Sequence, residues 1–207
     1  MCYMCYYIIF HLLKKTFDFF LVRNLTQLDI QENGIDDKSG NWLSCFPENF
    51  TSLEVLNFAN LNTDVNFDAL ERLVSRCKSL KVLKANKSIS LEHLQRLLVC
   101  APQLTELGTG SFMPELTARQ YAELGSSFNQ LKNLNTLSGL WEATAPYLPV
   151  LYPACTNLTF LNLSYAFLQS IELASLLCQC PRLQRLWVWI FVFLILSHQF
   201  HSWKPIN

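Results

Sequence analysis

A short leucine phrase, Leu-x-x-Leu, recurs seven times along this chain and is usually followed two residues later by another apolar residue. Its first leucines are Leu25, Leu53, Leu80, Leu104, Leu134, Leu158 and Leu183. The intervals between them are 28, 27, 24, 30, 24 and 25 residues. Repetition at this period is typical of leucine-rich-repeat solenoids, in which each repeat buries its apolar face against its neighbours. We therefore expect an α/β horseshoe of about seven repeats, whose function depends on an extended surface.

Each repeat contains the pattern of a strand followed by the pattern of a helix. In the second repeat, Leu56 and Phe58 alternate with outward residues, which predicts a short strand. Four apolar residues at helical spacing follow the turn in several repeats. They are Phe67, Leu70, Leu73 and Val74; Leu91, Leu94, Leu97 and Leu98; and Ile171, Ala174, Leu177 and Cys178. We expect parallel strands on the concave face and helices on the convex face. The interval after Leu104 leaves room for an insertion near Met113.

The outward strand positions predict what the concave wall offers to a partner. They are Gln27, Asp29, Gln31; Val55, Asn57, Ala59; Val82, Lys84, Asn86; Glu106, Gly108, Gly110; Thr136, Ser138, Leu140; Phe160, Asn162, Ser164; and Arg185, Trp187, Trp189. Four of these carry a charge: Asp29, Lys84, Glu106 and Arg185. Such a wall suits a peptide and makes a poor cradle for anions.

Net charge and the positions of the cysteines indicate which partners and which cellular location to expect. Sixteen basic and sixteen acidic residues cancel, which argues against nucleic acid or an anionic membrane as a partner. Cys77, Cys100, Cys155 and Cys180 each precede a leucine phrase by a similar distance. We expect them to be buried, reduced thiols, which favours an intracellular location.

Residues 1–23 and 190–207 differ from the repeats, so we divide the chain into these two apolar ends and a repeat domain at 24–189. The apolar run over residues 186–196 has eleven residues, fewer than the ~20 that span a bilayer. The N-terminal end lacks the basic start of a signal peptide.

Motifs that carry chemistry are weak. Gly108-Thr-Gly110 lacks the third glycine of a phosphate loop, so we interpret it as a tight strand exit. Cys2, Cys5, His198 and His201 have zinc-ligand spacing but form two short, isolated halves. His93 is expected to face solvent. We expect no metal and no enzyme active site.

The aromatic residues have two interpretations. Trp42, Trp141, Trp187, Trp189 and Tyr147 could anchor a partner protein. For Trp42 and Trp141, which occupy turn-to-helix positions, we favour packing between coils.

Several longer segments resemble one known family. They are residues 36–47 (DDKSGNWLSCFP), 69–77 (ALERLVSRC), 101–110 (APQLTELGTG), 161–166 (LNLSYA) and 176–188 (LLCQCPRLQRLWV). Together they resemble the plant auxin-signalling F-box proteins of the transport-inhibitor-response family, from about Asn24 to Trp189. The related jasmonate-receptor F-box proteins match these segments less well.

The resemblance implies a substrate-recognition subunit of a cullin–RING ubiquitin ligase. In such proteins an N-terminal F-box binds the ligase adaptor. Auxin on the upper surface of the repeats completes a site for a repressor degron, an inositol polyphosphate lies beneath, and the repressor is degraded in the nucleus. The resemblance places Asp36 and Asp37 on the rim where the degron docks, although they also suit a solvated turn that caps the next helix.

This chain departs from the family pattern at both ends. No F-box pattern precedes the repeats, and no positions match the C-terminal repeats that carry most hormone and inositol-phosphate ligands. We therefore expect a middle portion of a longer protein, which alone binds neither the adaptor nor auxin. Two alternatives remain: a free-standing repeat scaffold that binds a protein on its concave wall, and a repeat protein anchored to a membrane by its ends.

Overall fold

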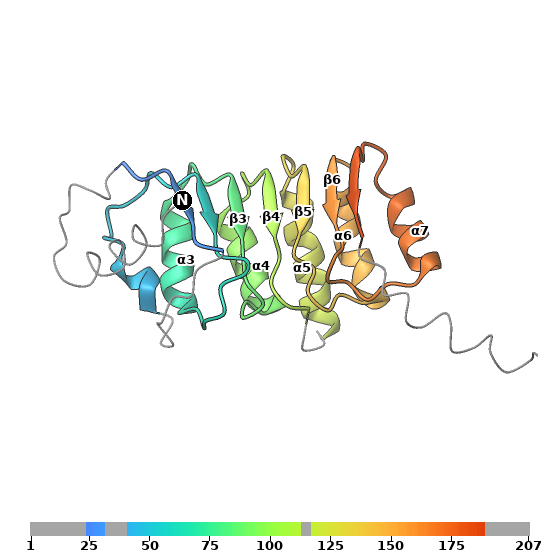
Figure 1. The fold of residues 1–207 in the computed structure, drawn as a ribbon, viewed down its shortest axis with the longest axis horizontal. Coiled ribbons are helices and arrows are strands. Elements are labelled where there is room, and N and C mark those ends of the chain that lie inside the picture. The colour runs from blue at the N-terminus through green and yellow to red at the C-terminus, as the bar shows by residue number, and fades with distance from the viewer. Residues whose placement is uncertain (1–23, 32–40, 113–116, 189–207) are drawn as a thin grey trace, which may run out of the picture.

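The structure, a computed structural model, describes residues 24–31, 41–112 and 117–188. Seven strands form one parallel sheet whose spatial order follows the chain (Figure 1). They are β1 (Gln27–Asp29), β2 (Val55–Asn57), β3 (Val82–Lys84), β4 (Glu106–Gly108), β5 (Thr136–Ser138), β6 (Phe160–Asn162) and β7 (Arg185–Trp187). The predicted leucine-rich-repeat solenoid is confirmed, with one strand for each leucine phrase.

Helices connect the strands and cover one face of the sheet (Figure 1). The α-helices are α3 (Phe67–Arg76), α4 (Leu91–Cys100), α5 (Ala118–Gln130), α6 (Leu148–Cys155) and α7 (Ser170–Cys178). Two 3₁₀ segments, η1 (Asn41–Cys45) and η2 (Ala145–Tyr147), complete the described elements. None of the helices in the described ranges is long and apolar enough to cross a membrane.

The leucine phrase sets the register of the sheet. Its second leucine stands at the centre of each strand, so that Leu56 pairs with Leu83 and Leu83 with Leu107. Because side chains alternate along a strand, a slip of one residue would turn these leucines away from the helices. Leucines stacked in adjacent coils therefore hold every strand in register.

Polar side chains start the helices where the sequence turns from strand to helix. Asn66 accepts a hydrogen bond from the Ala69 amide at 3.1 Å, and Ser90 accepts one from the His93 amide at 3.3 Å. Thr117 and Gln120 cap α5 reciprocally, which satisfies donors that the first turn leaves free. At 13 residues α5 is longer than the 10-residue α3 and α4, which accounts for part of the long interval after Leu104. Met113 lies outside the described residues.

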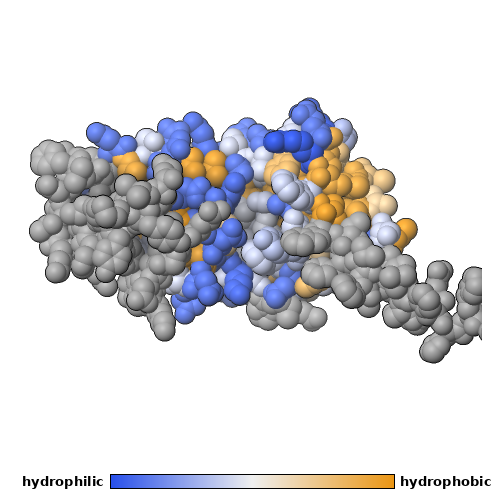
Figure 2. Space-filling model, viewed as in Figure 1, coloured by the Kyte–Doolittle hydropathy of each residue, from blue (hydrophilic) through white to orange (hydrophobic). Residues whose placement is uncertain are grey.

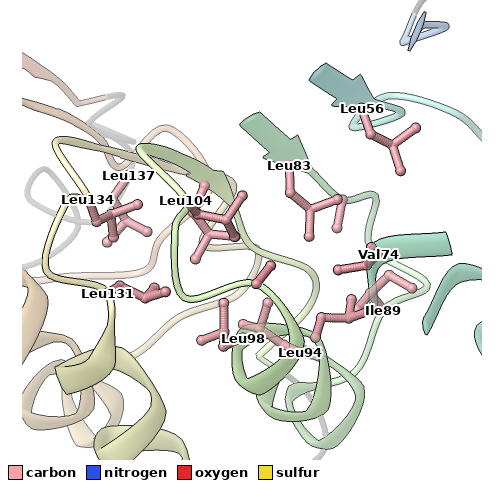
Figure 3. Close-up of a cluster of buried hydrophobic side chains, with 14 of the residues drawn as sticks. Leu56, Val74, Leu83, Ile89, Leu94, Leu98, Leu104, Leu131, Leu134 and Leu137 are labelled. Atoms are coloured by element: carbon pink, nitrogen blue, oxygen red, sulfur yellow. The ribbon is translucent and has the colours of Figure 1, made fainter. Parts of the chain in front are cut away.

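The core lies between the strand layer and the helix layer. Leu56 and Leu83 from the strands point toward Val74, Leu94 and Leu98 from the helices (Figure 3). The helical stripes predicted for α3 and α4 are confirmed, because their apolar residues are buried. The core is thus a continuous column that neighbouring coils share.

The prediction of which α7 residues face the core is wrong. The structure buries Leu176 and partly buries Leu173, whereas Ile171 is 75% exposed. Of the other residues in the predicted stripe, Ala174 and Cys178 are exposed and Leu177 is half-buried.

The reason is that the buried positions of each helix lie at fixed distances before the leucine phrase that follows it. Leu173 and Leu176 stand ten and seven residues before Leu183, as Leu94 and Leu97 stand before Leu104. Helix α7 has apolar residues on both faces, so the spacing of apolar residues within the helix does not show which of them are buried. The same counting explains Cys100, which falls four residues before Leu104 where the other repeat cysteines fall three before their leucine. Ala101 takes the buried position instead, and Cys100 is half-buried.

Several residues predicted on the outward wall are buried instead. Leu140 is enclosed because Gly139, at φ +88°, turns the chain after β5. Asn57 and Gly108, the last residues of β2 and β4, are buried against the adjacent strands. Asn86 and Gly110 are also buried, beyond the ends of β3 and β4. The period-two alternation ends with the three-residue strands, so it does not extend to these loop positions.

Candidate protein-binding surface

The concave wall is formed by the outward residues of the strands, and two of its four charges pair with each other. Lys84 Nζ lies 2.7 Å from Glu106 Oε1 on the adjacent strand. Asn57 Nδ2 donates a hydrogen bond to Asp29 Oδ2 at 3.0 Å. The wall therefore offers hydrogen-bonding groups with little net charge, as the sequence predicts.

Glycines allow close contact between backbones where the chain leaves β4. A Cβ on Gly108 would lie 3.0 Å from Lys84 Cα, and one on Gly110 would lie 1.9 Å from the Ile89 carbonyl oxygen. Between them, Thr109 Oγ1 accepts a hydrogen bond from the Leu140 amide at 2.7 Å. These contacts support the interpretation of Gly108-Thr-Gly110 as a tight strand exit.

The C-terminal end of the wall is aromatic. The Arg185 guanidinium lies 4.8 Å from the centre of the Phe160 ring, a cation–π contact between adjacent strands. Trp187 is 64% exposed. Exposed apolar side chains gather at this end, where the surface over β6, β7 and α7 is the most hydrophobic part of the view in Figure 2.

We call the loops that follow the strands at their carboxyl ends the rim. Asn86 fixes the rim near β3, because its Nδ2 donates to the carbonyl oxygens of Leu61 at 2.8 Å and Thr63 at 2.9 Å. Its Oδ1 accepts hydrogen bonds from the amide and hydroxyl of Ser88. One buried amide side chain thus joins two consecutive loops.

The rim after β5 has an unusual backbone. Leu140 and Glu142 adopt positive φ angles of 41° and 62°, which cost free energy for residues with a Cβ. Ser111 Oγ donates a hydrogen bond to Glu142 Oε2 at 3.0 Å. Trp141 stacks on Tyr165 of the next coil, with ring centres 3.6 Å apart and an interplanar angle of 13°. The loop therefore holds a carboxylate and an aromatic ring side by side.

A hollow of about 490 Å³ opens on this rim. Its lining residues are Leu61, Asn62, Thr63, Asp64, Asn86, Lys87, Ser88, Ser111 and Glu142. Sequence reasoning missed it, because its residues follow four different strands and share no motif. The stacking of equivalent loops, which brings them together, was the only signal in the sequence.

Three of the aromatic residues that had two interpretations pack between coils. Trp42 is buried and meets the Phe58 ring edge-on at 5.8 Å. Tyr147 is buried and meets the Phe112 ring edge-on at 5.3 Å. The Trp141–Tyr165 stack also joins two coils, which confirms the packing interpretation for both tryptophans.

The prediction that His93 faces solvent is wrong. His93 in α4 is half-buried, and its ring stacks on that of Phe67 in the neighbouring helix α3, with ring centres 3.9 Å apart. Arg96 lies over the same ring at 4.6 Å and binds the Glu71 carboxylate with two nitrogens. This hydrogen bonding raises the pKa of Arg96.

The repeat cysteines are free thiols, and three of the four are buried. Burial raises the pKa of Cys77. A hydrogen bond to Cys180, together with burial, raises the pKa of Cys155. Protonated thiols in these positions fill the core as small apolar groups.

Several predicted residues lie outside the described ranges. They include Asp36 and Asp37, the two candidate partner-binding residues, as well as Cys2, Cys5, Trp189, His198 and His201. Within residues 24–31, 41–112 and 117–188, no cluster of His, Cys, Asp and Glu side chains could hold a metal ion.

Comparisons with known proteins agree with this architecture. No protein-family model matches the chain. One solved structure, the TLR13–ssRNA13 complex, shares the fold with a TM-score of 0.50 and 16% identity, over 79% of this chain and 22% of that one. The protein is a leucine-rich-repeat solenoid.

Its repeats are homologous to those of plant F-box proteins. "Transport inhibitor response 1-like protein Os05g0150500" of Oryza sativa subsp. japonica is 51% identical over 166 residues, which cover 80% of this chain and 28% of that protein. "GRR1-like protein 1" of Arabidopsis thaliana is 49% identical over 166 residues, with the same coverage. "Coronatine-insensitive protein 1" of Arabidopsis thaliana is more distant, at 28% over 173 residues, which cover 78% of this chain and 27% of that protein.

The resemblance to the transport-inhibitor-response family is therefore confirmed for the repeats. The chain spans little more than a quarter of the length of these relatives.

Proposed function

We propose that this chain supplies part of the substrate-recognition surface of an auxin-receptor F-box protein in a cullin–RING ubiquitin ligase. Identity of 51% over 166 residues to a transport-inhibitor-response-like protein carries this proposal. The role is non-catalytic: the repeats present a surface to a repressor degron, and another subunit transfers ubiquitin. Action in the nucleus follows from the same family role.

The wall supports a peptide ligand more than an anionic cofactor. An inositol polyphosphate needs several converging cations, yet Lys84 is paired with Glu106, and Arg185 lies four strands away. The two cations of the wall alone therefore do not fit that cofactor. In the proposed function its ligands, and those of auxin, belong to other repeats of the full-length protein.

A chimera tests the proposal. Residues 24–188 would replace the matching repeats of the rice relative, and auxin-dependent capture of a repressor degron peptide would be measured with the ligase adaptor bound. We expect capture that rises with auxin, as in the unmodified relative. A chimera that folds and binds the adaptor, yet captures no degron at saturating auxin, would contradict the proposal.

A free-standing scaffold that binds a protein on its concave wall is the second candidate function, and the sheet is compatible with it. Its seven strands pair in unbroken order, and the charges Lys84 and Glu106 at the centre of the wall are already neutralised within it. Such a scaffold would bind a protein without hormone. Degron capture by the chimera that does not change with auxin would favour this function.

A further inference from the structure

The hollow on the rim has a charged lining that the proposed function does not use. Asp64, Lys87 and Glu142 line it, and none of them takes part in the ion pairs found among the described residues. Two carboxylates and one ammonium group give the lining a net negative charge. A cationic group is therefore the charge that this hollow complements.

An aromatic pair adjoins Glu142, one of the residues that line the hollow. The Glu142 amide donates a hydrogen bond to the Tyr165 carbonyl oxygen at 2.9 Å, which joins the loop after β5 to the loop after β6. Trp141, the preceding residue, stacks on Tyr165, and both rings remain partly exposed. Phe167, two residues beyond, is 60% exposed. Partly exposed aromatic rings thus lie in the two loops that this hydrogen bond joins.

The mixture of these groups indicates the class of ligand. A free metal ion would need converging oxygen ligands, whereas Asp64 and Glu142 come from loops of different coils and share the hollow with Lys87. A lysine or arginine side chain satisfies carboxylates through hydrogen bonds as well as charge. Aromatic rings beside it bind the apolar part of the same ligand.

We propose that the rim binds an extended segment of a partner protein, in which a lysine or arginine enters the hollow and a neighbouring apolar side chain packs on Trp141 and Tyr165. This contact needs no hormone and is independent of the proposed ligase function. Because the charged lining residues are exposed, the contact is weak and is sensitive to salt.

Fluorescence anisotropy on the full 207-residue chain tests the proposal. The probe is a fluorescein-labelled peptide of repeated Arg-Leu-Ser triplets, and the matched peptide carries uncharged citrulline in place of arginine. We expect the arginine peptide to bind more tightly than the citrulline peptide, and the difference to shrink as salt is added. Equal affinity for the two peptides, or binding of neither, would overturn the proposal.

Variants that neutralise lining residues of opposite charge locate the contact. Glu142→Gln and Asp64→Asn should each weaken binding of the arginine peptide by about threefold, and Lys87→Gln should strengthen it by a similar factor. Glu123→Gln, on the exposed face of α5, is the matched control and should change nothing. Circular dichroism verifies the fold of each variant. Equal effects of the Glu142 and Glu123 variants would show that the peptide does not bind at the hollow.

Discussion

The coil of β3 and α4 and the coil of α7 and β7 contain the same phrase but differ in burial. Leu83, at the centre of β3, is 0% exposed, whereas the equivalent Leu186 in β7 is 41% exposed. Helix α4 buries four of its apolar residues, and α7 buries one. The difference indicates that a leucine in a repeat is stabilised by the coils on both sides of it, and not by its own repeat alone.

The largest expected difference between the two coils is the cost of removing this leucine. Leu83→Ala should lower the free energy of unfolding by about 3 kcal/mol, because it leaves a cavity that packed neighbours cannot close. Leu186→Ala should cost less than about 1 kcal/mol, since its side chain is already partly in water. Urea unfolding followed by circular dichroism measures both. Equal losses would show that burial in the two coils does not differ as described.

A glycine comparison tests how closely the inner coils pack. Gly110→Ala should destabilise the protein by about 2–3 kcal/mol, because the new Cβ collides with the Ile89 carbonyl oxygen. Gly125→Ala is the matched control: it lies in α5 with nothing within 4 Å of the new Cβ, and should stabilise the helix by up to about 1 kcal/mol. The same unfolding measurement applies. A tolerated Gly110 variant would mean that the loops after β3 and β4 lie further apart.

Removing an asparagine side chain should also cost more stability in the inner coil than in the C-terminal coils. Asn86→Ala removes the side chain that joins the loops of Leu61 and Ser88 and leaves buried carbonyls unpaired, at a cost of about 2 kcal/mol. Asn162 accepts the same pair of bonds from Ser164, but is half-buried, so Asn162→Ala should cost less than about 1 kcal/mol. Thermal unfolding of both variants measures the difference. A greater loss at Asn162 would contradict the expected order.

The smallest effect on stability is expected at Ile171. Ile171→Glu should change the free energy of unfolding by no more than about 0.5 kcal/mol, because the Ile171 side chain is 75% exposed. Acidic residues, Asp68 and Glu92, also hold the equivalent positions in α3 and α4. The same change removes exposed apolar surface, so light scattering should detect less aggregation. A large loss of stability would show that Ile171 is packed against another part of the chain.

The sequence predicts the sheet well because the leucine phrase carries both the register and the strand period. Leu56, Leu83 and Leu107 align as their spacing requires. Prediction fails where this period ends. Leu140 turns inward through the positive φ of Gly139, and α7 has apolar residues on both faces, so its own spacing does not identify the buried one.

The rim could not be predicted to the same extent. Asn86 was expected to point outward, yet it is buried because two loop carbonyls accept its hydrogen bonds. Asp64 and Glu142 are 78 positions apart in the sequence and lie around one hollow only because the coils stack. The degron role of Asp36 and Asp37 stays a prediction.

Hydrogen–deuterium exchange of the full chain tests the central claim that neighbouring coils, and not the repeat alone, stabilise each strand. Amides of β3 and β4 should exchange at rates near those of global unfolding, whereas amides of β7 and α7 should exchange faster through local opening. Peptides that contain Leu83 and Leu186 report the two regions in one experiment. Equal protection of both peptides, or slower exchange in β7, would contradict the account.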